Sequence, residues 1–79
     1  MAEAGEIALA LDLRGLKCPL PVLRTRKAVT TLPAGAMVSV ETTDQLASID
    51  IPHFCNENGH VLVLQEATEN GHRFVIRKG

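Results

Sequence analysis

In the stretch LRGLKCPLPVLRTRKAV, residues 13–29, the sequence predicts the end of a strand and the start of a helix. Cys18 stands at the position expected for the helix N-cap, and Pro19 suits the first helical position. Pro21 is tolerated because the first-turn amides have no acceptor within the helix. Apolar and small residues then recur at helical spacing, which predicts a helix to about residue 32. The predicted buried stripe consists of Val22, Thr25, Val29 and Leu32.

The sequence on either side of this stretch predicts strands. Residues 7–13 (IALALDL) place Ile7, Leu9, Leu11 and Leu13 on one face, as in a half-buried strand, and Gly15 ends it. After the helix, LPAG marks a turn, and residues 37–42 (MVSVET) predict a second short strand. A strand, a helix and a strand joined by short links favour a βαβ unit with parallel strands.

The second half of the chain predicts one more helix and two more strands. Asp50 is a suitable N-cap, Pro52 fits the first turn and Gly59 fits the C-terminal cap. A further helical turn before Asp50 is also compatible with the sequence. Residues 60–79 read as two strands with a hairpin signal at Asn70–Gly71. The order β-α-β-α-β-β predicts an α/β two-layer sandwich, with two helices packed on one face of a four-stranded mixed sheet.

Length and composition limit the possible classes of protein. A chain of 79 residues fits a single domain spanning residues 1–79, and we expect residues 1–6 to be flexible. The net charge of −1 argues against direct nucleic-acid binding. No apolar run is long enough to span a membrane, and the N-terminal residues are acidic where a signal peptide needs cations. We therefore expect a cytoplasmic protein without membrane contacts. We also expect a monomer.

The surroundings of Cys18 predict a reactive thiol. No acidic residue occurs from residue 13 through residue 40. The flanking cations are Arg14, Lys17, Arg24, Arg26 and Lys27. Nearby cations and the positive end of a helix both favour the thiolate, so the thiol pKa is expected to lie below its free value of about 8.5. A structural role for Cys18 as a small apolar residue is the alternative.

Several thiol chemistries lack their usual partners in this sequence. None of the three histidines is tied to Cys18 by a local pattern that would provide a base for hydrolysis. Pro19, Leu20 and Pro21 follow the cysteine, so the Cys-x-x-Cys pair of a dithiol oxidoreductase is absent. Sulfur transfer through a persulfide requires only thiolate attack and a good leaving sulfur. That reaction suits an isolated thiol with no bound cofactor and no metal.

The motif LDLRGLKCPLP resembles that of the TusA-type (SirA-like) sulfur-carrier family, and its matching residues are Asp12, Gly15, Cys18, Pro19 and Pro21. Similarity continues through RKAV at 26–29, IPHFC at 51–55, His60 and IRKG at 76–79. The resemblance implies that Cys18 accepts persulfide sulfur from a cysteine desulfurase or similar donor protein. It also implies transfer to a downstream acceptor protein, with the 2-thiouridine of tRNA as the destination.

The resemblance leaves other pathways and one other class open. Some family members serve sulfur oxidation, selenium metabolism or molybdenum-cofactor supply, and the motif does not separate these routes. A regulatory interaction module with a structural Cys18 is the rival from another class. An RNA-binding accessory is disfavoured because the chain has only two phenylalanines to stack on bases. The family often has Asp-Pro after the second strand, whereas Gln45 follows Asp44 here.

The remaining cysteine and the histidines are weaker candidates for a site. Cys55 shares the predicted buried face with Ile51 and Phe54, which favours a core position over a second reactive thiol. His53 and Cys55 lie two residues apart and face different sides of a helix, so a metal site there is disfavoured. For His60, a structural role in capping or packing and a functional role are equally open. We interpret His53 and His72 as surface residues.

Overall fold

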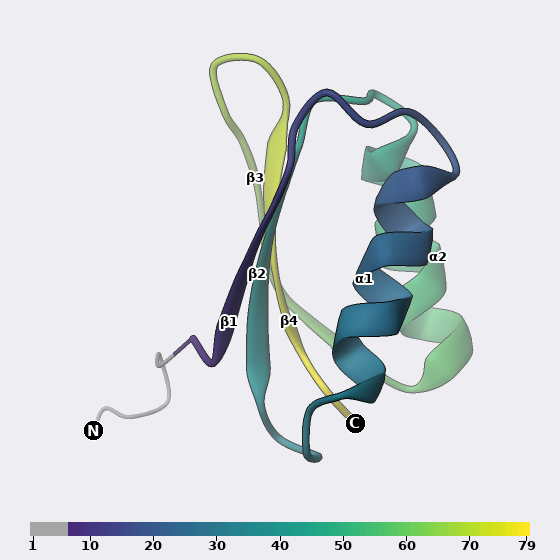
Figure 1. Ribbon diagram of the computed structural model, residues 1–79, viewed down its shortest axis with the longest axis vertical. Helices are drawn as coiled ribbons and strands as arrows, with labels where there is room; N and C mark the ends of the chain where they lie inside the picture. The colour runs from purple at the N-terminus through teal and green to yellow at the C-terminus, as the bar shows by residue number, and fades with distance from the viewer. Residues whose placement is uncertain (1–6) are drawn as a thin grey trace.

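The computed structural model describes residues 7–79, so the predicted flexibility of residues 1–6 lies outside the described residues. Both helices cover one face of a four-stranded sheet, which confirms the predicted two-layer α/β architecture and its βαβαββ order (Figure 1). The elements in chain order are β1 Leu9–Leu13, α1 Leu20–Thr30, β2 Met37–Thr42, α2 Ala47–Asn58, β3 Val61–Ala67 and β4 His72–Arg77.

The sheet is mixed and has the order β1-β2-β4-β3. β1 runs parallel to β2, with Leu11 opposite Val40, while β4 is antiparallel to both β2 and β3. The parallel pair is the one expected from the βαβ unit. β3 lies at the edge of the sheet, and its ladder with β4 is interrupted by a bulge between Leu62 and Leu64. Because β1 and β2 are parallel, the loops that follow them leave the sheet at the same end.

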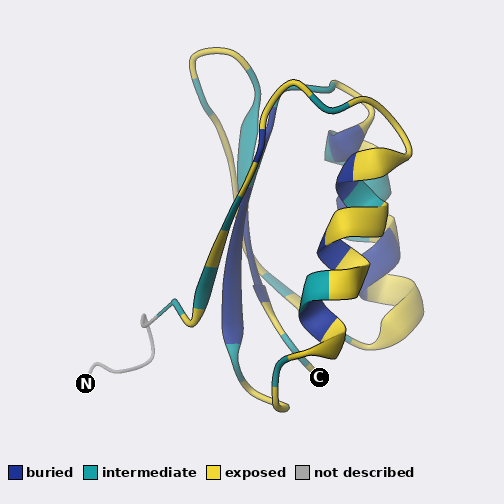
Figure 2. Ribbon diagram, viewed as in Figure 1, coloured by how far each residue is buried: buried dark blue, intermediate teal, exposed yellow. Residues whose placement is uncertain are grey.

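The core lies between the sheet and the two helices (Figure 2). Alternate residues of the central strands β2 and β4 point into it and are fully buried, as expected from the two-residue period of a strand. α2 contributes Ile51, Phe54 and Cys55, the face predicted for it. Cys55 is 2% exposed, which confirms its predicted position in the core. α1 contributes Pro21, Thr25 and Val29, whereas Val22 and Leu32 are only partly buried.

Both helices begin at a different residue from the one predicted. α1 starts at Leu20 with Pro19 as its N-cap residue, so the prediction that Cys18 is the N-cap is wrong by one residue. A turn in which the Leu20 N–H donates to the Lys17 carbonyl oxygen, at 2.8 Å, precedes the helix. Cys18 therefore belongs to the approach to the helix and is free to point away from the helix axis.

α2 starts at Ala47, which makes the prediction of Asp50 as its N-cap wrong. The backbone N–H groups of residues 47–49 donate to the carbonyl oxygens three residues earlier, so a tight turn begins the helix before Asp50 is reached. Asp50 and Pro52 consequently lie inside α2, and the Asp50 carboxylate is not used as a cap.

The predicted turns at the other element ends are confirmed. Gly59 ends α2 in the left-handed conformation, with φ of 74°, which glycine adopts without steric cost. The hairpin at Asn70–Gly71 joins β3 to β4 through a loop longer than two residues, closed by a hydrogen bond from Thr68 N–H to the Gly71 carbonyl oxygen at 2.8 Å.

Two isoleucines on α2 provide a matched test of this packing. Ile51 is fully buried, whereas Ile49 is 65% exposed. Replacing Ile51 with alanine leaves a cavity, so we expect Ile51→Ala to lower the free energy of unfolding by about 2–4 kcal/mol. Ile49→Ala should change it by no more than about 0.5 kcal/mol. Urea unfolding followed by circular dichroism measures both values, and equal losses would contradict the assigned faces of α2.

Candidate functional site

Cys18 lies where the loops that follow β1 and β2 come together. The Cys18 backbone N–H donates to Asp44 Oδ2 at 2.9 Å, and the Gly15 backbone N–H donates to Thr43 Oγ1 at 2.9 Å. These two hydrogen bonds join the loop of residues 14–19 to the loop of residues 43–46. The Cys18 side chain is exposed. The fold thus holds the cysteine backbone in place from a second loop while the sulfur remains accessible.

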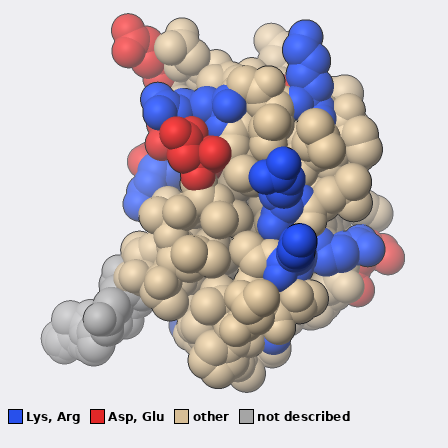
Figure 3. Space-filling view, in the orientation of Figure 1, with Lys and Arg blue, Asp and Glu red and all other residues tan. Residues whose placement is uncertain are grey.

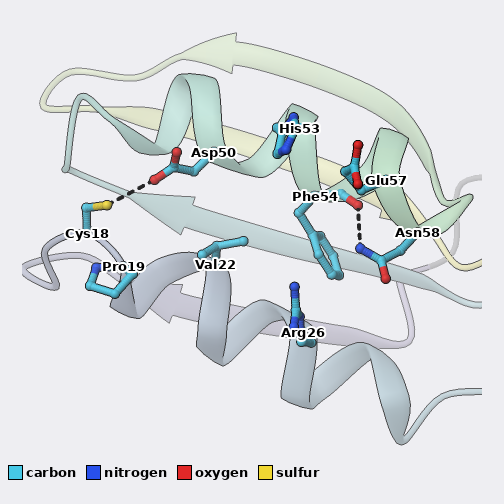
Figure 4. Close-up of a pocket in the computed structure, with 9 residues that line it drawn as sticks. All are labelled: Cys18, Pro19, Val22, Arg26, Asp50, His53, Phe54, Glu57 and Asn58. Atoms are coloured by element: carbon cyan, nitrogen blue, oxygen red, sulfur yellow. Dashed lines mark hydrogen bonds between the residues drawn. The ribbon is translucent and has the colours of Figure 1, made fainter.

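A groove of about 540 Å³ runs between α1 and α2, with Cys18 at one end (Figure 4). The α1 side of the groove is lined by Cys18, just before the helix, and by Val22 and Arg26 within it. These residues are spaced four apart, so they lie on one face. On the opposite side, α2 contributes Asp50, Phe54 and Glu57, at spacings of four and three residues. The groove therefore has an apolar middle and charged side chains along both walls.

Phe54 is the centre of a small aromatic cluster in this groove. The Arg26 guanidinium lies 5.7 Å from the centre of its ring, within the range of a cation–π contact. The ring of His60 packs against Phe54 with 5.3 Å between the centroids, and the Gly79 backbone N–H donates to His60 Nδ1 at 3.0 Å. Of the two roles left open for His60, the structure shows packing. Arg26 is held over the groove by the same cluster.

The other two histidines differ in their exposure. His53 is exposed and lines the groove, as expected for a surface residue. His72 is half-buried, and its Nδ1 atom is buried without a hydrogen-bond partner among the described residues, so its prediction as a simple surface residue is wrong. His72 begins β4 opposite Thr42 on β2, which explains why the sheet covers it.

The Cys18 thiol donates a hydrogen bond to the Asp50 carboxylate, with 3.1 Å between Sγ and Oδ2 (Figure 4). This hydrogen bond, together with desolvation and the negative charges of Asp50 and Asp44, raises the pKa of Cys18 above its ordinary value. The predicted lowering of the thiol pKa is therefore wrong. Asp44 and Asp50 are separated from Cys18 by 26 and 32 residues, so neither was visible in the local sequence.

Arg14 contributes less positive charge to the site than its position in the sequence suggested. Its guanidinium donates to both oxygens of Asp12, at 2.8 and 2.9 Å. The hydrogen bonds from Arg14 lower the pKa of Asp12 to about 2, so this carboxylate stays ionised and paired at neutral pH. Asp12 also accepts the Arg14 backbone N–H at 3.2 Å, so its carboxylate holds the turn that follows β1.

Residues 7–79 show neither a cluster of metal-binding side chains nor a helix suited to span a membrane. This part of the chain contains no group of three or more His, Cys, Asp or Glu side chains placed to hold a metal ion. His53 is exposed and Cys55 is buried, so the two residues face different sides of α2. Over the same residues, no helix has the length and apolar character needed to cross a membrane.

The fold and the site together define a small α/β domain that presents one accessible cysteine thiol at the approach to its first helix. A family model described as Sulfurtransferase TusA matches residues 9–78, which is most of the chain. The chain belongs to this family. Its members are sulfur carriers and sulfurtransferases that work in relays with donor and acceptor proteins.

Sequence reasoning found the cysteine but missed the two carboxylates beside it. The sequence predicts Asp50 as an N-cap because Asp is favoured there and Pro52 follows closely. No helix breaker stands between Leu46 and Ile49, and the further helical turn before Asp50 that the sequence allows is the one observed. That start places Asp50 within the helix and frees its carboxylate for another contact.

The two thiols should differ in both rate and pH dependence of alkylation. Burial raises the pKa of Cys55 to about 11, and the core shields it, so we expect iodoacetamide to modify Cys18 much faster in the native protein. The raised pKa of Cys18 means that its thiolate fraction at pH 7 is smaller in the folded chain than in the unfolded chain. Its alkylation rate should therefore rise with pH through a midpoint above that of the urea-unfolded chain.

Peptide-level mass spectrometry across pH 6–11, with and without urea, measures these rates. If the alkylation rate of Cys18 reaches its midpoint at a lower pH in the native protein than in the unfolded chain, the result would contradict the hydrogen bond to Asp50. Equal native rates for Cys18 and Cys55 would contradict their assigned exposures.

Proposed function

We propose that the protein is a persulfide carrier and that Cys18 is the residue that accepts and delivers the sulfur. The observation that carries this proposal is the position of Cys18: its thiol is exposed at the end of a groove, whereas Cys55 is buried. Membership of the TusA sulfurtransferase family supports a sulfur cargo. The exposure of Cys18 also argues against the rival interpretation of this residue as a structural part of an interaction module.

The proposed transfer needs only two thiols and one sulfur atom. The Cys18 thiolate attacks the outer sulfur of a persulfide on the donor protein, and the sulfur–sulfur bond of the donor breaks. The donor leaves as a thiolate that takes a proton from water, while Cys18 now carries the persulfide. In the second step an acceptor thiolate attacks the outer sulfur on Cys18 and regenerates the free thiol. The protein is thus a co-substrate at both steps and needs no bound cofactor.

For the partners, we propose a cysteine desulfurase as donor and a downstream relay protein as acceptor, in the cytoplasm, with tRNA 2-thiouridine as the destination. Supply of sulfur for sulfur oxidation or for the molybdenum cofactor is the alternative route for the same chemistry. Lysine and arginine side chains are spread over the helix side of the molecule in the view of Figure 3. Such charges suit transient docking to partner proteins, because they act mainly on the encounter rate.

Replacement of each cysteine tests the carrier site. Cys18→Ser should abolish sulfur loading, because the hydroxyl is a far weaker nucleophile, and should keep the fold because the side chain is exposed. Cys55→Ala is the matched control and should still load, although it loses some core packing. Incubation with a cysteine desulfurase and L-cysteine, followed by mass spectrometry, detects the added sulfur. Loading of Cys18→Ser at wild-type stoichiometry would refute the proposal.

The basic side of α1 gives a second test. Reversal of two charges in Arg26→Glu with Lys27→Glu should slow sulfur loading about tenfold at low salt if this surface meets the donor. Added salt should narrow the gap to wild type, because screening weakens attraction and repulsion alike. Arg77→Glu, at the exposed end of β4, is the control for a change of charge elsewhere. Unchanged loading of the double variant at low salt would show that donors dock on another surface.

A further inference from the structure

The Asp50 carboxylate contacts the sulfur of Cys18 and has no cationic partner among residues 7–79. Within residues 7–79, the ion pairs join Arg14 to Asp12 and Arg73 to Glu66, and neither involves Asp50. Asp50 is half-buried on the wall of the groove and points across it toward Cys18 (Figure 4). The carboxylate beside the reactive sulfur is thus open to the groove and carries a negative charge that no described cation pairs with.

The hydrogen bond favours the thiol over the thiolate. Carboxylates are much weaker bases than thiolates, so the proton stays on sulfur and the contact has the form S–H···O⁻. Loss of that proton would leave two negative charges about 3.1 Å apart, which is unfavourable at a partly buried site. Asp44 adds a further negative charge through its contact with the Cys18 backbone N–H. The free protein thus holds its nucleophile in the unreactive form.

The other charged groups of the groove do not relieve this arrangement. Arg26 lies over the Phe54 ring at the middle of the groove, and Glu57 lies one turn beyond Phe54 on α2. His53 lines the same wall as Asp50 but makes no hydrogen bond to it. No cation of the described chain replaces the proton as the partner of the Asp50 carboxylate.

We propose that Asp50 is a positioning residue that holds the Cys18 thiol protonated in the free carrier and binds a lysine or arginine side chain of the sulfur-donor protein on docking. The inference rests on the persulfide-carrier function proposed above. The cation pairs with the Asp50 carboxylate, the S–H group loses its acceptor and its proton passes to water. The Cys18 thiolate then attacks the outer sulfur of the donor persulfide, and the donor thiolate takes up one proton, so the numbers of protons and electrons balance.

This arrangement makes thiol reactivity depend on the presence of the donor. A small neutral electrophile does not pair with Asp50, so it meets the protonated thiol. A donor protein with a cation beside its persulfide meets the thiolate. The charge on Asp50 therefore favours sulfur transfer over modification by small reagents.

Substitution of Asp50 with asparagine should move these two reactions in opposite directions. Asp50→Asn removes the charge and keeps the shape, so Cys18 should react with iodoacetamide at pH 7 about threefold faster or more, with a lower midpoint in its pH profile. Without the neighbouring charge a larger fraction of Cys18 is thiolate, and the weaker nucleophilicity that accompanies a lower pKa offsets only part of that gain. Sulfur loading from a cysteine desulfurase with L-cysteine should instead slow about tenfold, because the cation of the donor loses its partner.

Glu57→Gln is the matched control, since it removes one carboxylate from the same wall of α2 at a distance from the sulfur. It should leave the alkylation profile unchanged. Asp50→Glu retains the charge, so its alkylation rate should stay below that of Asp50→Asn. If Asp50→Asn does not fold, the comparison of Asp50→Glu with wild type decides, because moving a carboxylate that contacts the sulfur must shift the alkylation midpoint.

Slower or unchanged alkylation of Asp50→Asn would overturn the proposal and assign Asp50 as a base or as a bystander. Faster alkylation together with faster loading would overturn the donor contact. Absence of sulfur loading in the wild-type protein would refute the proposed carrier function itself. The two failures are distinguishable, because the alkylation profile of Asp50→Asn is measured without any donor.

Discussion

The parallel pairing of β1 with β2 is the constraint on which the site depends. Parallel neighbours end at the same edge of a sheet, so the loop of residues 14–19 emerges beside the loop of residues 43–46. The two hydrogen bonds between these loops, from Cys18 to Asp44 and from Gly15 to Thr43, are possible only because of that arrangement. The same crossover sets α1 beside α2 and forms the groove at whose end the sulfur lies.

This arrangement gives Cys18 an electrostatic environment unlike the one that its neighbours in the sequence suggest. Along the chain the cysteine is surrounded by lysine and arginine, yet Arg14 turns back to Asp12, and the groups that contact the sulfur and its backbone are acidic. A hydrogen bond at 3.1 Å has a larger effect on a thiol than exposed cations screened by water. The cations of α1 itself, Arg24, Arg26 and Lys27, remain exposed, where they are available to a partner.

The sequence was sufficient where local rules govern the outcome. The bounds of β2, the left-handed Gly59 and the buried face that holds Cys55 follow from strand alternation, helix capping and helical periodicity. It failed at the two helix starts, because the turn before α1 and the tight turn before Ala47 depend on backbone contacts that several sequences satisfy. It failed at Asp50 for a different reason, since only the fold brings a residue 32 positions away to the cysteine.

The bulge in β3 has a consequence for how this small protein behaves among other chains. β3 is an edge strand on which Val61, Val63 and Leu64 are exposed, and an apolar free edge is a template for addition of a foreign strand. The shift of register between Leu62 and Leu64 breaks the straight row of backbone donors and acceptors that such addition needs. The irregular strand therefore limits the addition of a foreign strand, and with it aggregation, at this edge of the sheet.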